Sequence, residues 1–305
     1  MAMEDFLLTE SLNPDSMSID RLNAEGIVAL MLAEDARMLD AVAAEGVAIA
    51  RAVEFAAERF RRGGRLVYVG AGTSGRLGVL DASECPPTFG TRPEMVVGLI
   101  AGGPDALIRA IEGAEDDPEQ GAADLSELYV GPDDLVVGIS TSGRTPYVLG
   151  ALAEAKTRHA TTVALTCNRP SPIGMAADLE IAPLVGPEVV AGSTRLKGGT
   201  ATKLILNMIT TGAMVRFGKT FGNRMIDLQP TNHKLRLRAR RILREVAGVD
   251  DDRAGALLER SGGRLKPALL AALAEVSHEQ ALHLLEAGGG QIHAALEISR
   301  GKKLL

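Results

Sequence analysis

Hydrophobic residues along this chain follow two alternating patterns. Short, almost wholly apolar runs such as Leu66–Gly70 are separated by longer stretches in which apolar residues recur every three or four positions. Short runs of this kind are typical of strands buried on both faces, and the longer spacing is typical of amphipathic helices. The runs predict strands at Leu66–Gly70, Val96–Ala101, Leu135–Ser140, Thr162–Thr166 and Leu179–Ala182.

Helices are expected between these strands. The spacing predicts them at about 75–83, 104–113, 118–127 and 145–158, with Pro104 and Pro118 in first turns and Asp116 or Asp117 as a cap. Strands that alternate with helices predict an α/β fold built on a doubly wound, five-stranded parallel sheet. Ligands of such sheets bind at the carboxyl ends of the strands.

Helical segments are also expected on either side of this core. Ile19–Arg62 predicts two helices that begin after a cap at Ser18 or Asp20 and end at Gly63-Gly64. Residues 249–305 predict a small bundle of three short helices. The expected division is therefore an N-terminal arm and helices (1–62), an α/β domain (63–247) and a small helical domain (248–305).

Two further helices differ in character. The segment from Gly198 to Lys219 predicts one long helix that is apolar around much of its circumference, so we expect it to be buried. A second subunit could bury it, and a homodimer is therefore expected. Residues 233–247 predict a strongly basic helix. It is interpreted as an amphipathic helix with Leu235, Ile242 and Leu243 packed inward, although an RNA or membrane contact is the alternative.

Two of the predicted strands end in loops of nearly the same composition. Leu66–Gly70 is followed by Ala71-Gly-Thr-Ser-Gly75, and Leu135–Ile139 is followed by Ser140-Thr-Ser-Gly-Arg-Thr145. Glycine lets backbone N–H groups approach a ligand, a helix start adds free donors and a positive dipole end, and hydroxyls donate to phosphate oxygens. The pair predicts a crevice for a small phosphorylated molecule, whereas either loop alone is as readily an ordinary turn.

The first loop also matches a dinucleotide-binding pattern, Gly70-Ala-Gly-Thr-Ser-Gly75. That pattern expects an acid about 20 residues further on, at the end of the second strand. The acid at the end of the next predicted strand is Asp105, well beyond that distance. The second hydroxyl-rich loop has no role in a dinucleotide site, so the phosphate interpretation is favoured.

Composition narrows the function classes. The net charge of −6 and the absence of Trp, with aromatic residues at 3%, argue against a nucleic-acid partner. No apolar stretch is long enough for a membrane span, and the N-terminus lacks the features of a signal peptide. Cys85 and Cys167 predict buried, reduced thiols in a cytoplasmic protein, and the scattered histidines lack ligand spacing, so neither a metal nor another cofactor is expected.

Two acidic clusters are candidates for chemistry. Glu84 precedes Cys85-Pro-Pro87, where consecutive prolines predict the end of regular structure, and Glu115 lies in Glu112-Gly-Ala-Glu-Asp-Asp117. A carboxyl group partly desolvated beside an anion site has a raised pKa and can act as a general acid. Because loops after neighbouring strands converge, Glu115 is expected to approach Glu84. From the residues alone, surface acids or helix caps are the commoner interpretation.

The remaining candidates are cationic or hydroxyl groups near the long apolar helix. Arg195, Lys197 and Lys203 can neutralise a phosphate or carboxylate, or can pair with local acids. Ser193, in Gly192-Ser-Thr194, is a candidate for ligand contact and equally for a helix cap.

Taken together, these motifs resemble the sugar isomerase (SIS) domain family, whose members bind phosphosugars. Within it they are most similar to the N-acetylmuramic acid 6-phosphate etherase family, over about Thr9 to Glu245. Five ordered motifs carry the resemblance: Gly70-Ala-Gly-Thr-Ser-Gly-Arg-Leu-Gly78, Asp81-Ala-Ser-Glu-Cys-Pro-Pro-Thr88, Glu112-Gly-Ala-Glu-Asp-Asp117, Ser140-Thr-Ser-Gly-Arg-Thr-Pro146 and Gly192-Ser-Thr-Arg-Leu-Lys-Gly-Gly-Thr-Ala-Thr-Lys203.

The resemblance implies an enzyme that releases D-lactate from a phosphorylated muramic sugar in cell-wall recycling, by elimination followed by water addition. It implies that Glu84 protonates the leaving lactate and that Glu115 assists proton abstraction or water activation. Substrate contacts are expected from Gly72, Thr73, Ser74, Ser140, Thr141, Ser142, Gly143, Thr145 and Ser193. The alternatives on the same fold are a phosphosugar-sensing regulator, similar to the glucokinase regulatory protein, and an aldose–ketose isomerase.

Overall fold

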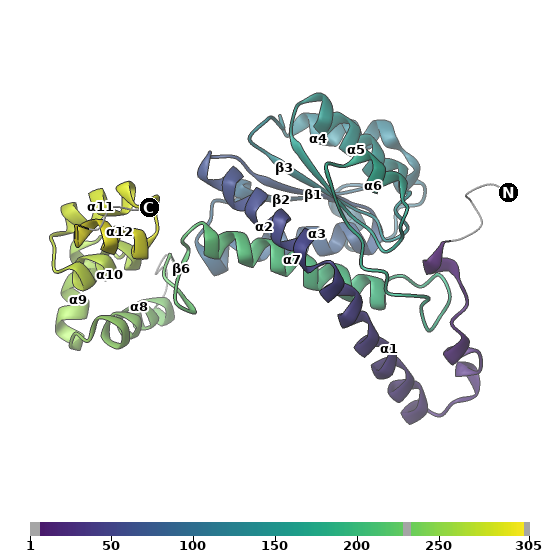
Figure 1. The fold of residues 1–305 in the computed structure, drawn as a ribbon, viewed down its shortest axis with the longest axis horizontal. Helices are drawn as coiled ribbons and strands as arrows, with labels where there is room; N and C mark the ends of the chain where they lie inside the picture. The colour runs from purple at the N-terminus through teal and green to yellow at the C-terminus, as the bar shows by residue number, and fades with distance from the viewer. Residues whose placement is uncertain (1–6, 228–232, 302–305) are drawn as a thin grey trace. The chain divides into compact units, whose positions relative to one another are not determined.

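The computed structural model describes residues 7–227 and 233–301. Contacts divide the chain into two compact units (Figure 1). The first unit is formed by the chain up to Ser83 together with Pro93–Gly212, and the second by Glu84–Arg92 together with the chain from Ala213 onward. Neither grouping tests the three-part division expected from the sequence, which stays a prediction.

The first unit is built on the predicted five-stranded sheet. Its strands are β1 (Leu66–Gly70), β2 (Val96–Ile100), β3 (Leu135–Ile139), β4 (Thr161–Leu165) and β5 (Leu179–Ile181). All pairings are parallel, and the order is β2-β1-β3-β4-β5. The expected strands and the parallel α/β fold are thereby confirmed.

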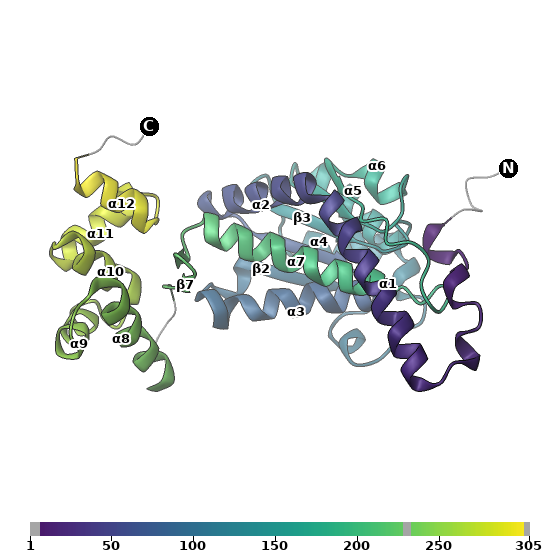
Figure 2. The same ribbon diagram turned by 60° about the horizontal axis from the view of Figure 1, so that its bottom comes forward.

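Helices cover both faces of the sheet, as the views in Figures 1 and 2 show. One face carries α2 (Gly46–Arg61), α3 (Gly72–Phe89) and α7 (Lys197–Arg216), and the other carries α4 (Pro118–Glu127), α5 (Pro146–Thr157) and α6 (Pro172–Ala176). Val67 and Val69 of β1 are wholly buried in a cluster with α5 residues. Tyr68 points to the opposite face, toward α3. A Cβ added at Gly78 of α3 would lie 2.9 Å from the Tyr68 Cβ.

A buried carboxylate links the elements on the face that carries α2, α3 and α7. Asp81 of α3 accepts hydrogen bonds from Tyr68 (3.0 Å), Asn207 (2.7 Å) and Thr210 (3.2 Å). Burial raises the pKa of Asp81, and these hydrogen bonds partly offset the rise. One side chain thus links β1, α3 and α7.

The N-terminal segment differs from its predicted form at its start. Short 3₁₀ helices η1 (Leu8–Glu10), η2 (Pro14–Ser16) and η3 (Ile19–Arg21) precede α1 (Ala24–Ala44). The expected caps Ser18 and Asp20 are wrong: Ser18 makes no cap hydrogen bond, and Asn23 caps α1 by accepting from the N–H of Gly26. The side-chain oxygen of Asn23 lies three residues before Gly26, the third helical residue, and reaches its N–H directly, so Asn23 displaces the earlier candidates.

Two predictions around the first loop are also wrong. Regular structure does not end at Cys85-Pro-Pro87, because α3 continues through both prolines to Phe89. Proline lacks the N–H donor but keeps a helical φ, and the ladder resumes when Gly90 donates to the Pro86 carbonyl. Buried Cys85 and Phe89, four residues apart on one helical face, account for the continuation.

The expected helix at 104–113 forms only one 3₁₀ turn, η5 (Pro104–Leu107), and a second, η6 (Ala114–Asp116), lies just beyond that segment. Ala106 is the single buried residue of η5, and Ile108 is 87% exposed. A helix in this segment therefore lacks the buried apolar face that stabilises short helices. Asp117 caps α4 and Pro118 starts it, as predicted.

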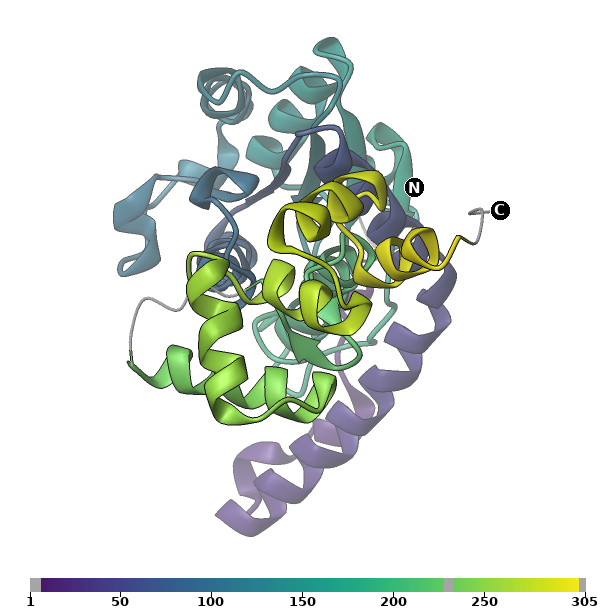
Figure 3. The same ribbon diagram turned by 90° about the vertical axis from the view of Figure 1, so that its left-hand side faces the viewer.

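The second unit is helical apart from a short hairpin, β6 (Thr220–Phe221) and β7 (Arg224–Met225). It contains α8 (His233–Ala247), α9 (Asp251–Arg260), α10 (Leu265–Ala274), α11 (His278–Ala287) and α12 (Ile292–Ser299), drawn in green to yellow in Figure 3. Within residues 249–301, where the structure describes this part of the chain, there are four helices and not the expected three. Glu275, with φ of 54°, ends α10, and Ser277 forms a capping box that starts α11.

Helix α8 has the amphipathic packing predicted for it. Ile242 and Leu243 are buried in one apolar cluster with residues of α9 to α12, and Leu235 packs against that cluster. The inward-facing interpretation of this basic helix is confirmed.

Candidate active site

Both hydroxyl-rich loops lie at the same edge of the sheet. They follow β1 and β3, which pair in parallel register with Gly70 beside Ile139. Two adjacent parallel strands bring their carboxyl ends, and the loops after them, next to one another. The predicted convergence of the two loops is therefore confirmed.

The first loop is shaped by close contact between backbone segments. A Cβ on Gly75 would lie 2.6 Å from the Gly70 carbonyl oxygen and 2.6 Å from Ile100, and one on Gly70 would lie 2.7 Å from the Gly75 nitrogen. Gly72 begins α3 with φ of +51° and has open space where a Cβ would be. The glycines let α3 start directly against β1, so its first N–H groups are presented at the sheet edge.

The second loop is held by a network of hydroxyl groups. The Ser140 hydroxyl lies 2.8 Å from that of Thr145 and 3.2 Å from that of Ser142, and it accepts from the N–H of Gly143 at 3.1 Å. Gly143 has φ of +74°, which completes the turn into α5. The loop thus places three hydroxyl groups together just before the start of a helix.

The start of α7 lies against both loops. A Cβ on Gly198 would lie 2.7 Å from the methyl carbon of Thr141, and one on Gly199 would lie 3.5 Å from that of Thr73. Glycine at these two positions lets the α7 backbone approach the two loops closely. Helix α7 therefore forms a third wall of the crevice.

Unlike α3 and α5, α7 already has a carboxylate at its N-terminus. Glu188 accepts from the N–H groups of Lys197 and Gly198, each at 3.0 Å, and burial raises its pKa. Glu188 is not among the residues predicted from the sequence. The sequence feature that could have indicated Glu188 is its position, since it is an acid that precedes a glycine-rich helix start. A carboxylate at a helix N-terminus is stabilised by the helix dipole.

Among the cationic candidates, Lys197 pairs with a local acid. Its ammonium group donates to Glu34 of α1 at 2.5 Å, and both side chains are almost wholly buried, at 3% and 4% exposure. Asn13 donates to the same carboxylate at 2.9 Å. A buried ammonium group that is paired with a carboxylate in this way stays with that partner, because separating the two would leave a buried charge unpaired. Arg195 and Lys203 are exposed.

A cavity of about 260 Å³ lies beside the first loop. Its lining includes Gly72 at the start of α3 and, from the segment after β2, Arg109, Glu112 and Glu115. Arg76 of α3 holds this segment in place by donating to the carbonyl oxygens of Leu107 (3.1 Å) and Arg109 (3.2 Å). The structure thus brings Glu115 together with the first loop.

Two other predicted residues are placed differently. Glu84 lies on the second half of α3, and its side chain is exposed. The structure therefore does not show the partial burial that was expected of Glu84. Its approach to Glu115 stays a prediction. Ser193 is half-buried in a turn, where its N–H donates to Val190 and its carbonyl accepts from Leu196. Thr73 is half-buried and Ser74 is buried in α3.

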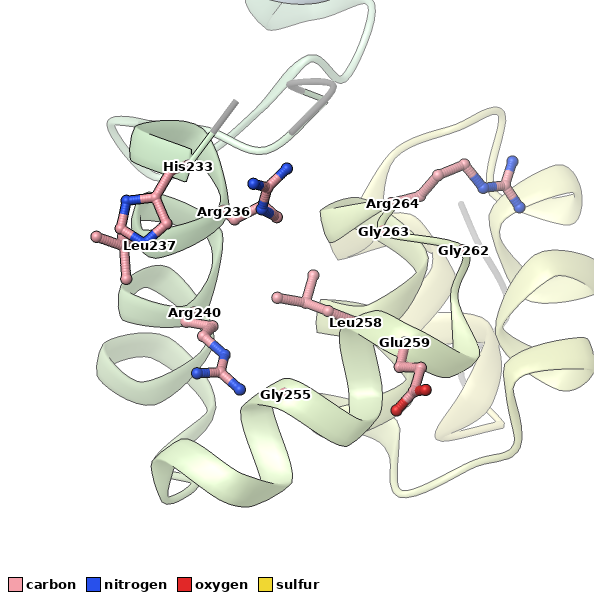
Figure 4. Close-up of a pocket in the computed structure, with 10 residues that line it drawn as sticks. All are labelled: His233, Arg236, Leu237, Arg240, Gly255, Leu258, Glu259, Gly262, Gly263 and Arg264. Atoms are coloured by element: carbon pink, nitrogen blue, oxygen red, sulfur yellow. The ribbon is translucent and has the colours of Figure 1, made fainter. Parts of the chain in front are cut away.

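A larger cavity, of about 690 Å³, lies in the helical unit between α8 and the turn after α9 (Figure 4). Cationic side chains surround it, among them Arg236 and Arg240, with Leu258 pointing inward. Arg240 is paired with Asp251 at 3.0 Å. The cavity has neither a hydroxyl-rich loop nor a pair of acids, so the smaller cavity is the better candidate for catalysis.

Two further predictions concern metals and membranes. Within residues 7–227 and 233–301, no group of three or more His, Cys, Asp or Glu side chains has the geometry of a metal site. In the same described ranges, none of the helices is both long enough and apolar enough to span a bilayer. Cys85 and Cys167 are buried thiols outside any disulfide, as expected, and burial raises the pKa of Cys167 to about 12.

Two family models match parts of this chain. Residues 48–156 match the glucokinase regulatory protein N-terminal SIS domain, and residues 117–212 match the SIS domain. Among solved structures, a phosphoheptose isomerase from Neisseria gonorrhoeae has a TM-score of 0.49 and 20% identity, covering 62% of this chain and 98% of that one.

Curated relatives are much more similar. The N-acetylmuramic acid 6-phosphate etherase of Rhodopirellula baltica is 54% identical over 90% of this chain and 91% of its own. That of Gloeobacter violaceus is 57% identical over 87% and 86%, and that of Gloeothece citriformis 52% over 95% and 95%. Identity at this level over nearly the whole of each chain shows that this chain belongs to the N-acetylmuramic acid 6-phosphate etherase family.

Proposed function

We propose that this chain cleaves the D-lactyl ether of N-acetylmuramic acid 6-phosphate, giving N-acetylglucosamine 6-phosphate and D-lactate. The observation that carries the proposal is identity of 52–57% over most of the chain with relatives of that name. The geometry supports it, since two hydroxyl-rich loops, two helix starts with free donors and a cavity lined by an acid lie at one sheet edge. The enzyme is a carbon–oxygen lyase that uses no cofactor.

The second loop binds the phosphate in this proposal. The hydroxyl groups of Ser140, Ser142 and Thr145, with the backbone of residues 140–145, hold the phosphate at the start of α5. The first loop, through Gly72, Thr73 and Ser74, positions the sugar, and Ser193 contacts it from the turn before α7. These groups supply orientation, and the chemistry is left to the acids.

The acids carry two proton transfers. In the ring-opened sugar the aldehyde acidifies the C2 proton, so Glu115 removes that proton and the C3–oxygen bond breaks. The lactyl alkoxide is a poor leaving group, and Glu84 donates the proton that lets it depart as lactate. Water then adds across the C2–C3 double bond, which restores a hydroxyl at C3 and a hydrogen at C2.

The assembly in this proposal is a homodimer in the cytoplasm. Helix α7 is apolar around most of its circumference, yet Met208 and Val215 remain 44% and 47% exposed in the single chain. Covering such side chains with a second copy removes apolar surface from water. Light scattering at micromolar concentration tests the dimer, and a stable monomer would contradict it.

The alternative is a phosphosugar-sensing regulator. The match of residues 48–156 to the glucokinase regulatory protein domain favours it. A regulator binds the phosphosugar without breaking a bond, whereas the proposed enzyme turns it over. The two functions therefore differ in one measurable product.

The deciding experiment is the release of D-lactate from N-acetylmuramic acid 6-phosphate, followed with a D-lactate-specific dehydrogenase. We expect catalytic release, with N-acetylglucosamine 6-phosphate formed in equal amount. Unphosphorylated N-acetylmuramic acid is the matched control and should be a far poorer substrate. Tight binding of the phosphosugar without any lactate would contradict the enzyme and support the regulator.

A further inference from the structure

One backbone carbonyl in the second loop is held by an unusual number of donors. The Thr141 oxygen accepts from the N–H of Cys167 at 3.0 Å, from the Asn168 side-chain amide at 2.9 Å and from the Thr166 hydroxyl at 3.3 Å. All three donors come from the segment after β4, on one side of the loop. The Thr141 carbonyl therefore points firmly toward that segment.

The direction of this carbonyl determines the direction of the next N–H group. In a planar trans peptide, the carbonyl oxygen and the amide hydrogen point to opposite sides. Since the Thr141 oxygen faces Asn168, the Ser142 N–H faces away from it. Among the described residues, the Ser142 N–H donates no hydrogen bond, and the bonds of Ser142 that the structure gives involve its hydroxyl group. This donor is left available to a ligand of the loop.

The Asn168 amide is itself oriented by the N-terminal arm. Its amide nitrogen donates to the Thr9 hydroxyl at 3.0 Å, and its oxygen accepts from the Thr9 N–H at 3.4 Å. Both side chains are buried, at 4% and 1% exposure. Rotating the amide by half a turn would place its oxygen against the Thr141 oxygen and leave buried donors unpaired, which is costly. Thr9 thus keeps the amide in the orientation that holds the loop.

The arm has a second attachment, at the start of α7. Asn13 donates to Glu34 at 2.9 Å, and Glu34 accepts from Lys197 at 2.5 Å. The arm is therefore held at both the second loop and the third wall of the crevice. An arm that is anchored at two buried points can hold a loop in position to within the few tenths of an ångström that ligand binding requires.

We propose that Thr9 and Asn168 are positioning residues, which aim the Ser142 N–H at the substrate phosphate by holding the Thr141 carbonyl. The proposal rests on the proposed function only in taking a phosphosugar as the ligand. It gives the N-terminal arm a part in substrate binding, although the arm contributes no group that touches substrate.

The test compares two substitutions at one position. Thr9→Val keeps the shape of the side chain but removes the hydroxyl acceptor, whereas Thr9→Ser keeps the hydroxyl. We expect Thr9→Val to weaken binding of N-acetylglucosamine 6-phosphate about tenfold, the typical effect of one misaligned bond to a charged group. Thr9→Ser should bind as the parent does. In turnover, Thr9→Val should raise KM by the same factor and leave kcat nearly unchanged.

A matched control separates positioning from stability. Thr162 is also a wholly buried threonine, and its hydroxyl bonds Asp178 at 2.8 Å at the opposite end of β4. Thr162→Val should lower the melting temperature without changing the affinity for the phosphosugar. Equal losses of affinity in Thr162→Val and Thr9→Val would overturn the proposal, because they would mark a general loss of stability.

A spectroscopic readout follows the Ser142 amide directly. In the ¹⁵N-labelled full chain, inorganic phosphate should shift the Ser142 amide signal in the parent and in Thr9→Ser. The shift should be much smaller in Asn168→Ala. Absence of any phosphate response at Ser142 in the parent would overturn the proposal. A parent that binds phosphosugar but releases no lactate would instead refute the proposed activity, while the affinity ratios would still decide the positioning role.

Discussion

The two hydroxyl-rich loops have similar compositions but are built in different ways. In the first loop, Gly70 and Gly75 let strand and helix backbones touch, and Ser74 is buried in α3. In the second, the hydroxyl groups of Ser140 and Thr145 bond each other, and the turn is braced from the segment after β4. The first loop gives close access at a helix start, and the second gives an array of donors.

This difference assigns different tasks to the two sides of the crevice. Glu115 lines a cavity with the first loop, so the proton transfer that we propose for Glu115 is placed on that side. The hydroxyl network and the start of α5 suit the second side to the phosphate. Substitutions on the first side should therefore act mainly on kcat, and those on the second mainly on KM.

The largest expected effect comes from the acids. Glu115→Gln keeps the size of the side chain but cannot accept the C2 proton, so we expect kcat to fall by about 10²–10⁴ while phosphosugar binding is retained. Glu84→Gln should lower lactate release by a similar factor. Exchange of the C2 proton in deuterated water, followed by NMR, separates the two: Glu115→Gln should slow it more. Lactate release near the parent rate in either variant would remove that residue from the proposed chemistry.

The next largest effect is expected in the second loop. Ser140→Ala with Ser142→Ala removes two hydroxyl donors, each worth about 1.5–3 kcal/mol when the acceptor is charged, so KM should rise steeply with a smaller change in kcat. Ser277→Ala is the control, because it removes the α11 cap in the helical unit and should cost about 1 kcal/mol of stability without changing KM. An unchanged KM in the double variant would place the phosphate elsewhere.

A smaller effect is expected from packing at the first loop. A Cβ at Gly75 would lie 2.6 Å from a backbone oxygen, so Gly75→Ala should lower the free energy of unfolding by about 1–3 kcal/mol. Gly46→Ala, at the start of α2 with nothing within 4 Å, should be neutral or slightly stabilising. Chemical denaturation measures both. A fully stable Gly75→Ala protein would show that the close strand–helix contact is not required.

An effect of similar size, which fades at low pH, is expected at the opposite ends of the same two strands. Asp134, just before β3, accepts from Arg65, just before β1, at 2.7 Å. Burial raises the pKa of Asp134, but the hydrogen bonds from Arg65 and from the Gly131 N–H, with the charge of Arg65, together outweigh burial and lower that pKa. Its ionised form therefore adds stability above the ordinary aspartate pKa, and this is lost as pH falls through the lowered value.

Asp134→Asn tests this dependence. The variant should be less stable than the parent by about 1–3 kcal/mol at neutral pH. The difference should shrink as pH falls below about 4, the reference region for aspartate. Melting curves between pH 7 and pH 3 measure it. A difference that stays constant with pH would show that Asp134 acts through shape and not through charge.

Local pattern was sufficient where neighbours along the chain decide the outcome. The five strands, the cap at Asp117 and the convergence of the two loops followed from apolar runs and turn chemistry. Patterns failed where burial decided. α3 passes through Pro86 and Pro87 because Cys85 and Phe89 are buried beyond the expected end. The segment at 104–113 lacks such a buried face and forms only turns.

By itself, the sequence determined the parallel α/β fold, the two loops and the family, because these depend on local periodicity and on motifs read in order. The tertiary structure alone decided which side chains meet across long separations. Lys197 pairs with Glu34, Thr9 orients Asn168, and Glu115 lines the cavity of the first loop. The physical reason is that such contacts cost chain entropy and form only once packing has brought distant segments together. The spacing of residues along the chain therefore does not predict them.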